Sequence, residues 1–260
     1  MNLILYQDAF EVANPFGSAK CVHEVVGVFY ILGNLYPEFR SQIDGIQLAL
    51  LIKDKHVKHF GHEMVYSRLI ADLKRFEQGL DVDGEHCVPV RVRFILGDYI
   101  GSHSIGGFIE NFSATEYMCR YCLQRRPDFL LDKSFTTEAT ARTMVNYGKA
   151  LAELSANETL PHHQGIKFDS PFNVFQDYHV ANGGLPPCLA HDLFETIVQR
   201  DVCLFIKYFT QKNFFTYDVL NRKIKEFRFS GADALDKPSI VNPKDKLSGQ
   251  SVQTWCFIEY

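Results

Sequence analysis

Two aspartates follow apolar segments that have the composition of β-strands. Asp8 comes after the run at 2–7, and Asp98 comes after the valine-rich run at 87–96 and a glycine. One aspartate in such a place is more often a turn residue, because its side chain hydrogen-bonds to the local backbone. Two carboxylates held side by side repel each other and therefore favour protons or cations. The pair predicts a site for Mg²⁺ or Mn²⁺, of the kind that cleaves phosphodiesters with two metal ions and normally uses a third acidic residue.

A second candidate site is the CxxC motif formed by Cys119 and Cys122. The motif is half of a zinc site, and it can equally be a redox pair or two ordinary thiols. No thioredoxin-like βαβ pattern surrounds it, which counts against the redox reading. Further zinc ligands could come from residues that are individually more typical of a surface or a core: His162, His163, His179, Cys188 and His191.

Other polar groups have weaker patterns. His191 and Glu195 lie one helical turn apart and could share a metal, although an acidic first turn of an amphipathic helix explains them better. Arg120, Arg125 and Arg126 gather around the CxxC motif and could contact phosphates. The other five cysteines are interpreted as buried thiols: Cys21, Cys87, Cys188, Cys203 and Cys256.

The first half of the chain has a pattern that would bring the two aspartates together. Strands are predicted at 2–7, 24–32, 46–52 and 87–96, and an amphipathic helix is predicted at 61–78. A right-handed crossover through this helix places the fourth strand parallel to the first and beside it. Both strands then end at the same edge of the sheet, where open α/β sheets bind ligands. This β-β-β-α-β-α order predicts an α/β fold with a ribonuclease-H-like mixed sheet.

The second half is predicted to be mostly helical, with no internal repeat. The expected helices lie at 136–154, 190–209 and 216–228, and a long ordered loop rich in proline and glycine is expected at 157–188. We therefore predict a ribonuclease-H-like core over 1–112 and a mostly helical domain that carries the CxxC motif over 113–260.

Composition narrows the class of protein. The chain has 260 residues, of which 46% are hydrophobic, and its net charge of −4 counts against a module that binds DNA through surface charge alone. It lacks an apolar run of the roughly 18 to 20 residues that a membrane span needs, and it lacks a signal peptide. Seven scattered cysteines favour a reducing compartment over a disulfide framework. We expect a nuclear or cytoplasmic protein that is not secreted and does not contact a membrane.

The order and spacing of several motifs resemble those of transposases of the CACTA (En/Spm) group, in the form common in animal genomes. The likeness runs over essentially the whole chain. The matching stretches are Tyr6-Gln-Asp-Ala-Phe10, Asn14-Pro-Phe-Gly17, Gly97-Asp-Tyr-Ile-Gly-Ser-His-Ser-Ile-Gly-Gly-Phe-Ile-Glu-Asn-Phe112, Cys119-Arg-Tyr-Cys122, Leu185-Pro-Pro-Cys-Leu-Ala-His-Asp-Leu-Phe-Glu195, Lys246-Leu-Ser-Gly249 and Trp255-Cys-Phe257.

The resemblance implies a DDE nuclease core with a helical insertion between its second and third acids. The first acid of the family falls on Asp8 and the second on Asp98, and these two residues would be catalytic and would bind Mg²⁺ or Mn²⁺. Intact relatives cut DNA at transposon ends and join the 3′ ends to target DNA, and a homodimer is compatible with this role. In the related recombinase of antigen-receptor genes, the CxxC shares Zn²⁺ with two histidines shortly before the catalytic glutamate, which would make Cys119 and Cys122 zinc ligands.

The sequence departs from this pattern at its ends. The histidine pair and the catalytic glutamate are expected after the region of Trp255, and a DNA-binding segment is expected before the first strand. Glu195 lies inside the presumed insertion and is not the best match for the third acid. We therefore expect a partial core that is weakly active or inactive. The alternatives are a non-catalytic, zinc-stabilised remnant that binds nucleic acid or protein, and a pseudogene product without function.

Overall fold

A computed structural model describes the chain except for residues 13–23, 41, 114, 132–138, 232–233, 235–236, 245–246 and 248–260. The turn expected at Asn14-Pro-Phe-Gly17, the motif at Trp255-Cys-Phe257, and Cys21 and Cys256 lie outside the described residues. The described chain divides into two compact units, Met1–Pro186 and Pro187–Tyr260.

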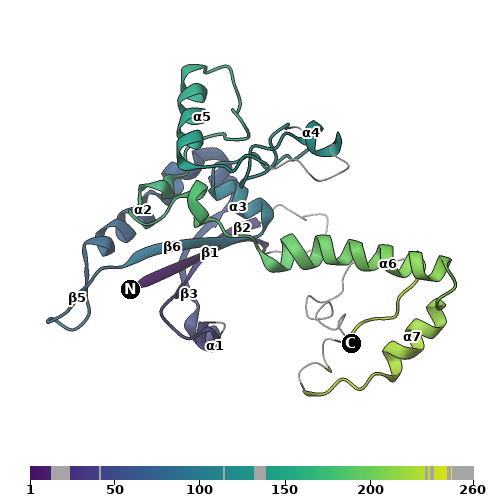
Figure 1. The fold of residues 1–260 in the computed structure, drawn as a ribbon. Helices are drawn as coiled ribbons and strands as arrows, with labels where there is room; N and C mark the ends of the chain where they lie inside the picture. Colours follow the sequence, from purple (N-terminus) through teal and green to yellow (C-terminus); the bar gives the residue numbers. More distant parts are fainter. Residues whose placement is uncertain are drawn as a thin grey trace. The chain divides into compact units, whose positions relative to one another are not determined.

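The first unit is built on a mixed sheet of four strands with the order β3-β2-β1-β6 (Figure 1). Strand β1 (Asn2–Glu11) pairs antiparallel with β2 (Glu24–Leu32), and β2 pairs antiparallel with β3 (Gln47–Lys53). Strand β6 (Arg91–Gly97) lies parallel to β1 on its other side. The prediction of an α/β chain with a mixed sheet is confirmed.

The connections within this unit are mostly short. A helical turn α1 (Pro37–Arg40) and a 3-10 turn (Ile43–Gly45) link β2 to β3. The long helix α2 (Asp54–Gln78) then crosses over, and a hairpin of β4 (Leu80–Asp81) and β5 (Cys87–Val88) leads into β6.

Three predicted boundaries in this region were wrong. Strand β1 does not end before Asp8, because Asp8 and the three residues after it continue to pair with residues 24–27 of β2. Helix α2 begins at Asp54 rather than at 61, and it is interrupted at Gly61, which has a φ of 78°. The single strand expected at 87–96 is divided at Pro89, which has no N–H to donate to a ladder.

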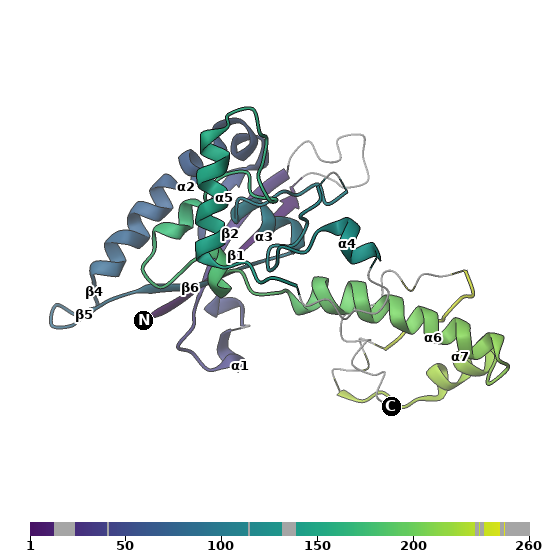
Figure 2. The same cartoon turned by 45° about the horizontal axis from the view of Figure 1, so that its top comes forward.

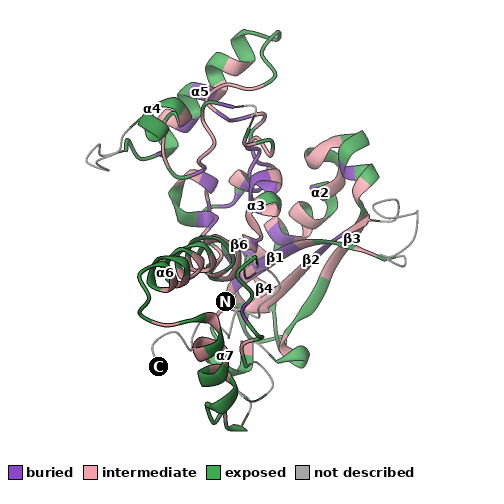
Figure 3. Ribbon diagram, turned by 90° about the vertical axis from the view of Figure 1, so that its right-hand side faces the viewer, coloured by how far each residue is buried: buried purple, intermediate pink, exposed green. Residues whose placement is uncertain are grey.

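Helix α2 covers one face of the sheet and makes the core with it (Figure 2). Leu3, Leu5 and Gln7 alternate along β1 and are buried against the helix residues Tyr66 and Leu73. In Figure 3 the buried residues gather in the strands and in α3. This packing fixes the register of β1, because a slip by one residue would move its apolar side chains to the other face.

The rest of the first unit is short helices and ordered loops. It holds α3 (Tyr99–Ile105), α4 (Arg126–Leu131), α5 (Met144–Ala156), a 3-10 turn (Pro171–Val174) and a short π-helical segment (Val180–Gly184). The helix expected at 136–154 begins only at Met144, because Thr143 caps it and forms a capping box with Asn146. Residues 139–143 are not helical, and 136–138 lie outside the described residues.

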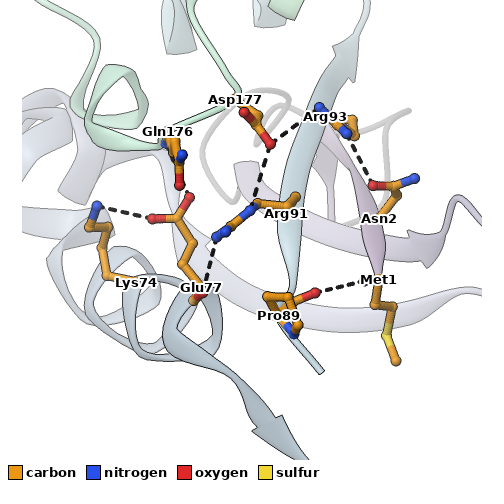
Figure 4. A network of polar contacts seen from close by, with 9 residues as sticks. All are labelled: Met1, Asn2, Lys74, Glu77, Pro89, Arg91, Arg93, Gln176 and Asp177. Atoms are coloured by element: carbon orange, nitrogen blue, oxygen red, sulfur yellow. Dashed lines mark hydrogen bonds and ion pairs between the residues drawn. The ribbon is translucent and has the colours of Figure 1, made fainter. Parts of the chain in front are cut away.

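A polar network fastens the segment around residues 174–177 to α2 and β6 (Figure 4). The buried Glu77 carboxylate pairs with Lys74 at 3.0 Å and accepts the Gln176 N–H at 3.1 Å. Arg91 donates to the Glu77 carbonyl at 3.0 Å, and its Nε lies 3.6 Å from Asp177. The network thus satisfies a carboxylate that would otherwise be costly to bury.

The second unit is helical and has its own small core. A π-helical segment (Leu189–Val198) runs directly into α6 (Gln199–Gln211), and α7 (Tyr217–Glu226) follows. The helices expected at 190–209 and 216–228 are therefore present. Their apolar residues pack around Val241 and Leu247. The two compact units divide after Pro186. The boundary predicted at residue 112 concerns a different division, between a catalytic core and an insertion, and it stays a prediction.

Candidate functional site

The strand register brings Asp8 and Asp98 to neighbouring places at one edge of the sheet. Gln7 and Gly97 are the last paired residues of the parallel strands β1 and β6, and each aspartate is the next residue along its chain. Neighbouring strands lie about 4.8 Å apart, a separation that two aspartate side chains can span to reach a shared cation. Both aspartates are half-buried.

The two aspartates differ in their local role. Asp98 caps helix α3, and its Oδ1 accepts the N–H of Gly101. A Cβ at Gly101 would lie 2.9 Å from this oxygen, so glycine allows the close approach. The Asp8 side chain has no hydrogen-bond or ion-pair partner among the residues that the structure describes. Asp98 therefore has a structural role as a helix cap, and the described contacts show no such role for the Asp8 carboxylate.

Buried side chains hold this part of the sheet edge in place. The Tyr66 hydroxyl donates to Gln7 Oε1 at 2.7 Å, and both side chains are buried. Burial raises the pKa of Tyr66, so its hydroxyl keeps the proton that it donates. A Cβ at Gly97 would lie 3.2 Å from the Gln7 carbonyl oxygen, so the two strand ends pack closely. The backbones that carry Asp8 and Asp98 are thereby fixed relative to each other.

Further carboxylates lie at the same edge, and the sequence reading missed them. Asp54 follows β3, which runs parallel to β1, and Glu24 begins β2 opposite Glu11 at the end of β1. The pKa of Lys58 is raised, first by its hydrogen bond to Asp54 and also by the charges of Glu24 and Glu110. The sequence carried a signal that could have identified Asp54, because this residue closely follows an apolar run just as Asp8 does.

The two aspartates fit only part of a metal site. Carboxylate oxygens are the ligands that Mg²⁺ prefers. Among the described residues, however, the structure places no group of three histidine, cysteine, aspartate or glutamate side chains where they could hold one ion. Within the described part of the chain, Asp8 and Asp98 could therefore supply only two of the ligands that such a site needs.

Cys119 and Cys122 lie within hydrogen-bonding distance of each other. Burial is the main cause that raises the pKa of Cys122, and the hydrogen bond with Cys119 adds to it. Arg142 ties the motif to its surroundings, because its Nη2 donates to the carbonyls of Cys119 at 3.2 Å and Gln164 at 2.9 Å. His163, one of the proposed partner ligands, lies 2.8 Å from Glu153 instead. The thiols form a pair without a third ligand in the described chain.

The arginines near the CxxC motif are already engaged. Arg120 is only 2% exposed, and its guanidinium lies 5.1 Å from the Tyr99 ring centre and 4.5 Å from that of Tyr121. Arg125 pairs with Glu116 at 3.1 Å, and Arg126 donates to backbone carbonyls. The suggestion that Arg120 contacts phosphates was wrong, because stacking between aromatic rings buries it.

The cysteines are less uniformly buried than expected. Cys87 is exposed, which contradicts its interpretation as a buried thiol, while Cys188 and Cys203 are half-buried. In the second unit, Cys188 Sγ lies 3.1 Å from His191 Nδ1, and His191 Nε2 lies 3.9 Å from Glu195.

Comparisons with known proteins identify no family for this chain. No model of a protein family matches the chain, and no curated protein sequence matches it either. Within the described residues, none of the helices combines the length and the apolar composition that crossing a bilayer requires.

Proposed function

We propose that this chain is a partial DDE nuclease core of the CACTA transposase type. The motif order resembles that group, and the strand order β3-β2-β1-β6 with the crossover helix α2 supports a ribonuclease-H-like sheet. The observation that carries the proposal is the parallel register of β1 and β6. It makes Asp8 and Asp98 neighbours although ninety residues separate them in the sequence.

In this proposal the two aspartates hold divalent cations for chemistry on DNA phosphodiesters. Bound Mg²⁺ or Mn²⁺ would supply a hydroxide nucleophile and stabilise the leaving oxygen. Asp8 and Asp98 provide the oxygen ligands for the cation. The hydrogen bond between Tyr66 and Gln7 holds strand β1, which carries Asp8, against helix α2. Intact relatives act at transposon ends in the nucleus. Among the described residues, no third acidic side chain joins Asp8 and Asp98 in a group that could hold one ion.

Calorimetric titration with Mn²⁺ and Mg²⁺ tests the site. Asp98→Asn is the sharpest variant, because asparagine caps helices about as well as aspartate and removes only the charge. Asp8→Asn is its counterpart, and Asp72→Asn on the solvent side of α2 is the control. We expect the first two variants to lose Mn²⁺ binding and the control to keep it. Unchanged binding in both would contradict the proposal.

Catalysis is tested separately with a DNA strand-cleavage assay in Mn²⁺. We expect weak or undetectable cleavage, because two carboxylates leave the metal site incomplete. Robust cleavage that disappears in Asp98→Asn would show that the chain supplies a complete site, and the partial-core proposal would then be wrong.

The hydrogen-bonded thiols favour one second candidate, a non-catalytic zinc-stabilised remnant that binds nucleic acid or protein. Two adjacent thiols are a typical half of a structural zinc site. Metal analysis of the purified protein separates the candidates. One Zn²⁺ that is lost in Cys119→Ser, without any Mn²⁺ binding, would favour the remnant.

A further inference from the structure

A thiol, an imidazole and a carboxylate lie in sequence at the start of the second unit. Cys188 Sγ is 3.1 Å from His191 Nδ1, which is hydrogen-bonding distance for sulfur, and His191 Nε2 is 3.9 Å from Glu195 Oε2. Helix geometry produces this arrangement, because Cys188 occupies the position before the helix and the other two residues follow on its first turns. Nothing in the proposed nuclease site uses these residues.

The imidazole is the group that can activate the thiol, since a histidine beside a cysteine can take the thiol proton. Asp192 accepts the Cys188 N–H at 2.9 Å and so holds the backbone that carries the thiol. The side chains of His191 and Glu195 are 44% and 48% exposed, so solvent screens any charge interaction between them. The Cys188 thiol is itself partly exposed, so small reagents can reach it.

We propose that Cys188 is a reactive thiol that forms mixed disulfides with small disulfides such as oxidised glutathione. In this step the Cys188 proton passes to His191 Nδ1, and the sulfur attacks one sulfur of the glutathione disulfide. The disulfide bond of the reagent breaks, a Cys188–glutathione disulfide forms, and the other half leaves as glutathione thiolate. The reaction exchanges one disulfide for another, so no additional oxidant is needed.

Three other described cysteines have different surroundings, namely Cys87, Cys119 and Cys122. Cys87 is exposed, but its neighbour His86 is engaged with Asp83 at 2.8 Å. Cys119 and Cys122 share a hydrogen bond with each other. Cys87 is therefore an internal control, since it is more accessible than Cys188 and has no imidazole against its sulfur in the described contacts.

Alkylation kinetics with iodoacetamide test the proposal, with the extent at each cysteine followed by peptide mass spectrometry at pH 6. An unassisted thiol is almost fully protonated at this pH. A thiol beside a base has a larger thiolate fraction, and this gain outweighs the lower nucleophilicity of such a thiolate. We expect Cys188 to react about five-fold faster than Cys87 in the unmodified protein. His191→Gln should remove this advantage, whereas His59→Gln, an exposed histidine on α2, should leave it unchanged.

The pH dependence provides a second measurement that needs no variant. The ratio of the Cys188 rate to the Cys87 rate should fall as the pH rises from 6 to 9, because a thiol in general needs the help of a neighbouring base less as the pH rises. Incubation with oxidised glutathione should add a glutathionyl mass at Cys188 first, and Cys188→Ser should abolish that product. Equal rates of the two cysteines at pH 6, a ratio that does not change with pH, or a Cys188 rate unaffected by His191→Gln would overturn the proposal.

Discussion

The hydrogen bond between Tyr66 and Gln7 allows a sharp test of how the sheet edge is held. The Tyr66 side chain is fully buried, and its hydroxyl donates to Gln7 Oε1 at 2.7 Å. Tyr66→Phe removes one oxygen and keeps the ring that packs 5.2 Å from the Phe172 ring centre. The variant therefore isolates the hydrogen bond from the apolar packing.

The expected loss follows from the buried acceptor that remains. Gln7 is 4% exposed, so its Oε1 cannot recover a water molecule without a structural change. Leaving such a group unsatisfied costs about 1–3 kcal/mol. For a chain of this size, that corresponds to a decrease in Tm of about 2–12 °C.

Differential scanning calorimetry measures the change. Tyr36→Phe is the matched control, because Tyr36 is 72% exposed and should lose almost no stability. In a Gln7→Met background the same Tyr66→Phe change should cost much less, since the buried acceptor is then absent. Equal Tm values for Tyr66→Phe and Tyr36→Phe would refute the reasoning.

Three further predictions concern other parts of the first unit. Gly107→Ala should cost about 2–4 kcal/mol in denaturant unfolding, because φ is +73° and the new Cβ would meet the Phe168 carbonyl oxygen at 2.2 Å. Gly61→Ala has a similar φ of +78°, with a ψ of 162° that few residues other than glycine adopt, but open space around the new Cβ, so it should cost less, about 1–3 kcal/mol; equal losses would contradict this difference. Burial lowers the pKa of His103 to about 4, so its contribution to stability is fully present above pH 6.5 and is lost as the pH falls toward 4. Unfolding of His103→Asn should depend less on pH in that window than unfolding of the unmodified protein, and an unchanged dependence would argue against the buried neutral imidazole. Asp98→Ala should lose about 1 kcal/mol that Asp98→Asn retains, because only asparagine can cap α3; equal stability of the two variants would show that the cap contributes nothing.

The sequence predicted the order of the strands better than their ends. Alternation in β1 and β6 and the apolar face of α2 are local patterns, so they could be recognised without the fold. Asp8 was placed outside its strand because Asp-Ala-Phe-Glu at 8–11 has no apolar run. Its pairing depends on residues 24–27 of another strand.

The contacts that hold the candidate site are long-range, and this limited their prediction. Gln7 and Tyr66 are 59 residues apart and meet only once the register is set. Arg120 carries a surface-type side chain, and only the aromatic rings around it show that it is buried. The Cys188–His191 contact is local by contrast, and its three-residue spacing at a helix start was visible in the sequence.

In the proposed function, Asp8 and Asp98 bind a divalent cation together at the sheet edge. The most direct test is a titration of the ¹⁵N-labelled protein with substoichiometric Mn²⁺, followed by NMR, because the bound ion broadens the amide signals nearest to it. We predict that the signals of Gly97 and of Gly27, which pairs with Asp8, disappear first, and that Asp8→Asn abolishes this effect. Broadening that begins elsewhere, such as at the acidic β4–β5 hairpin, or that persists in Asp8→Asn would contradict the claim.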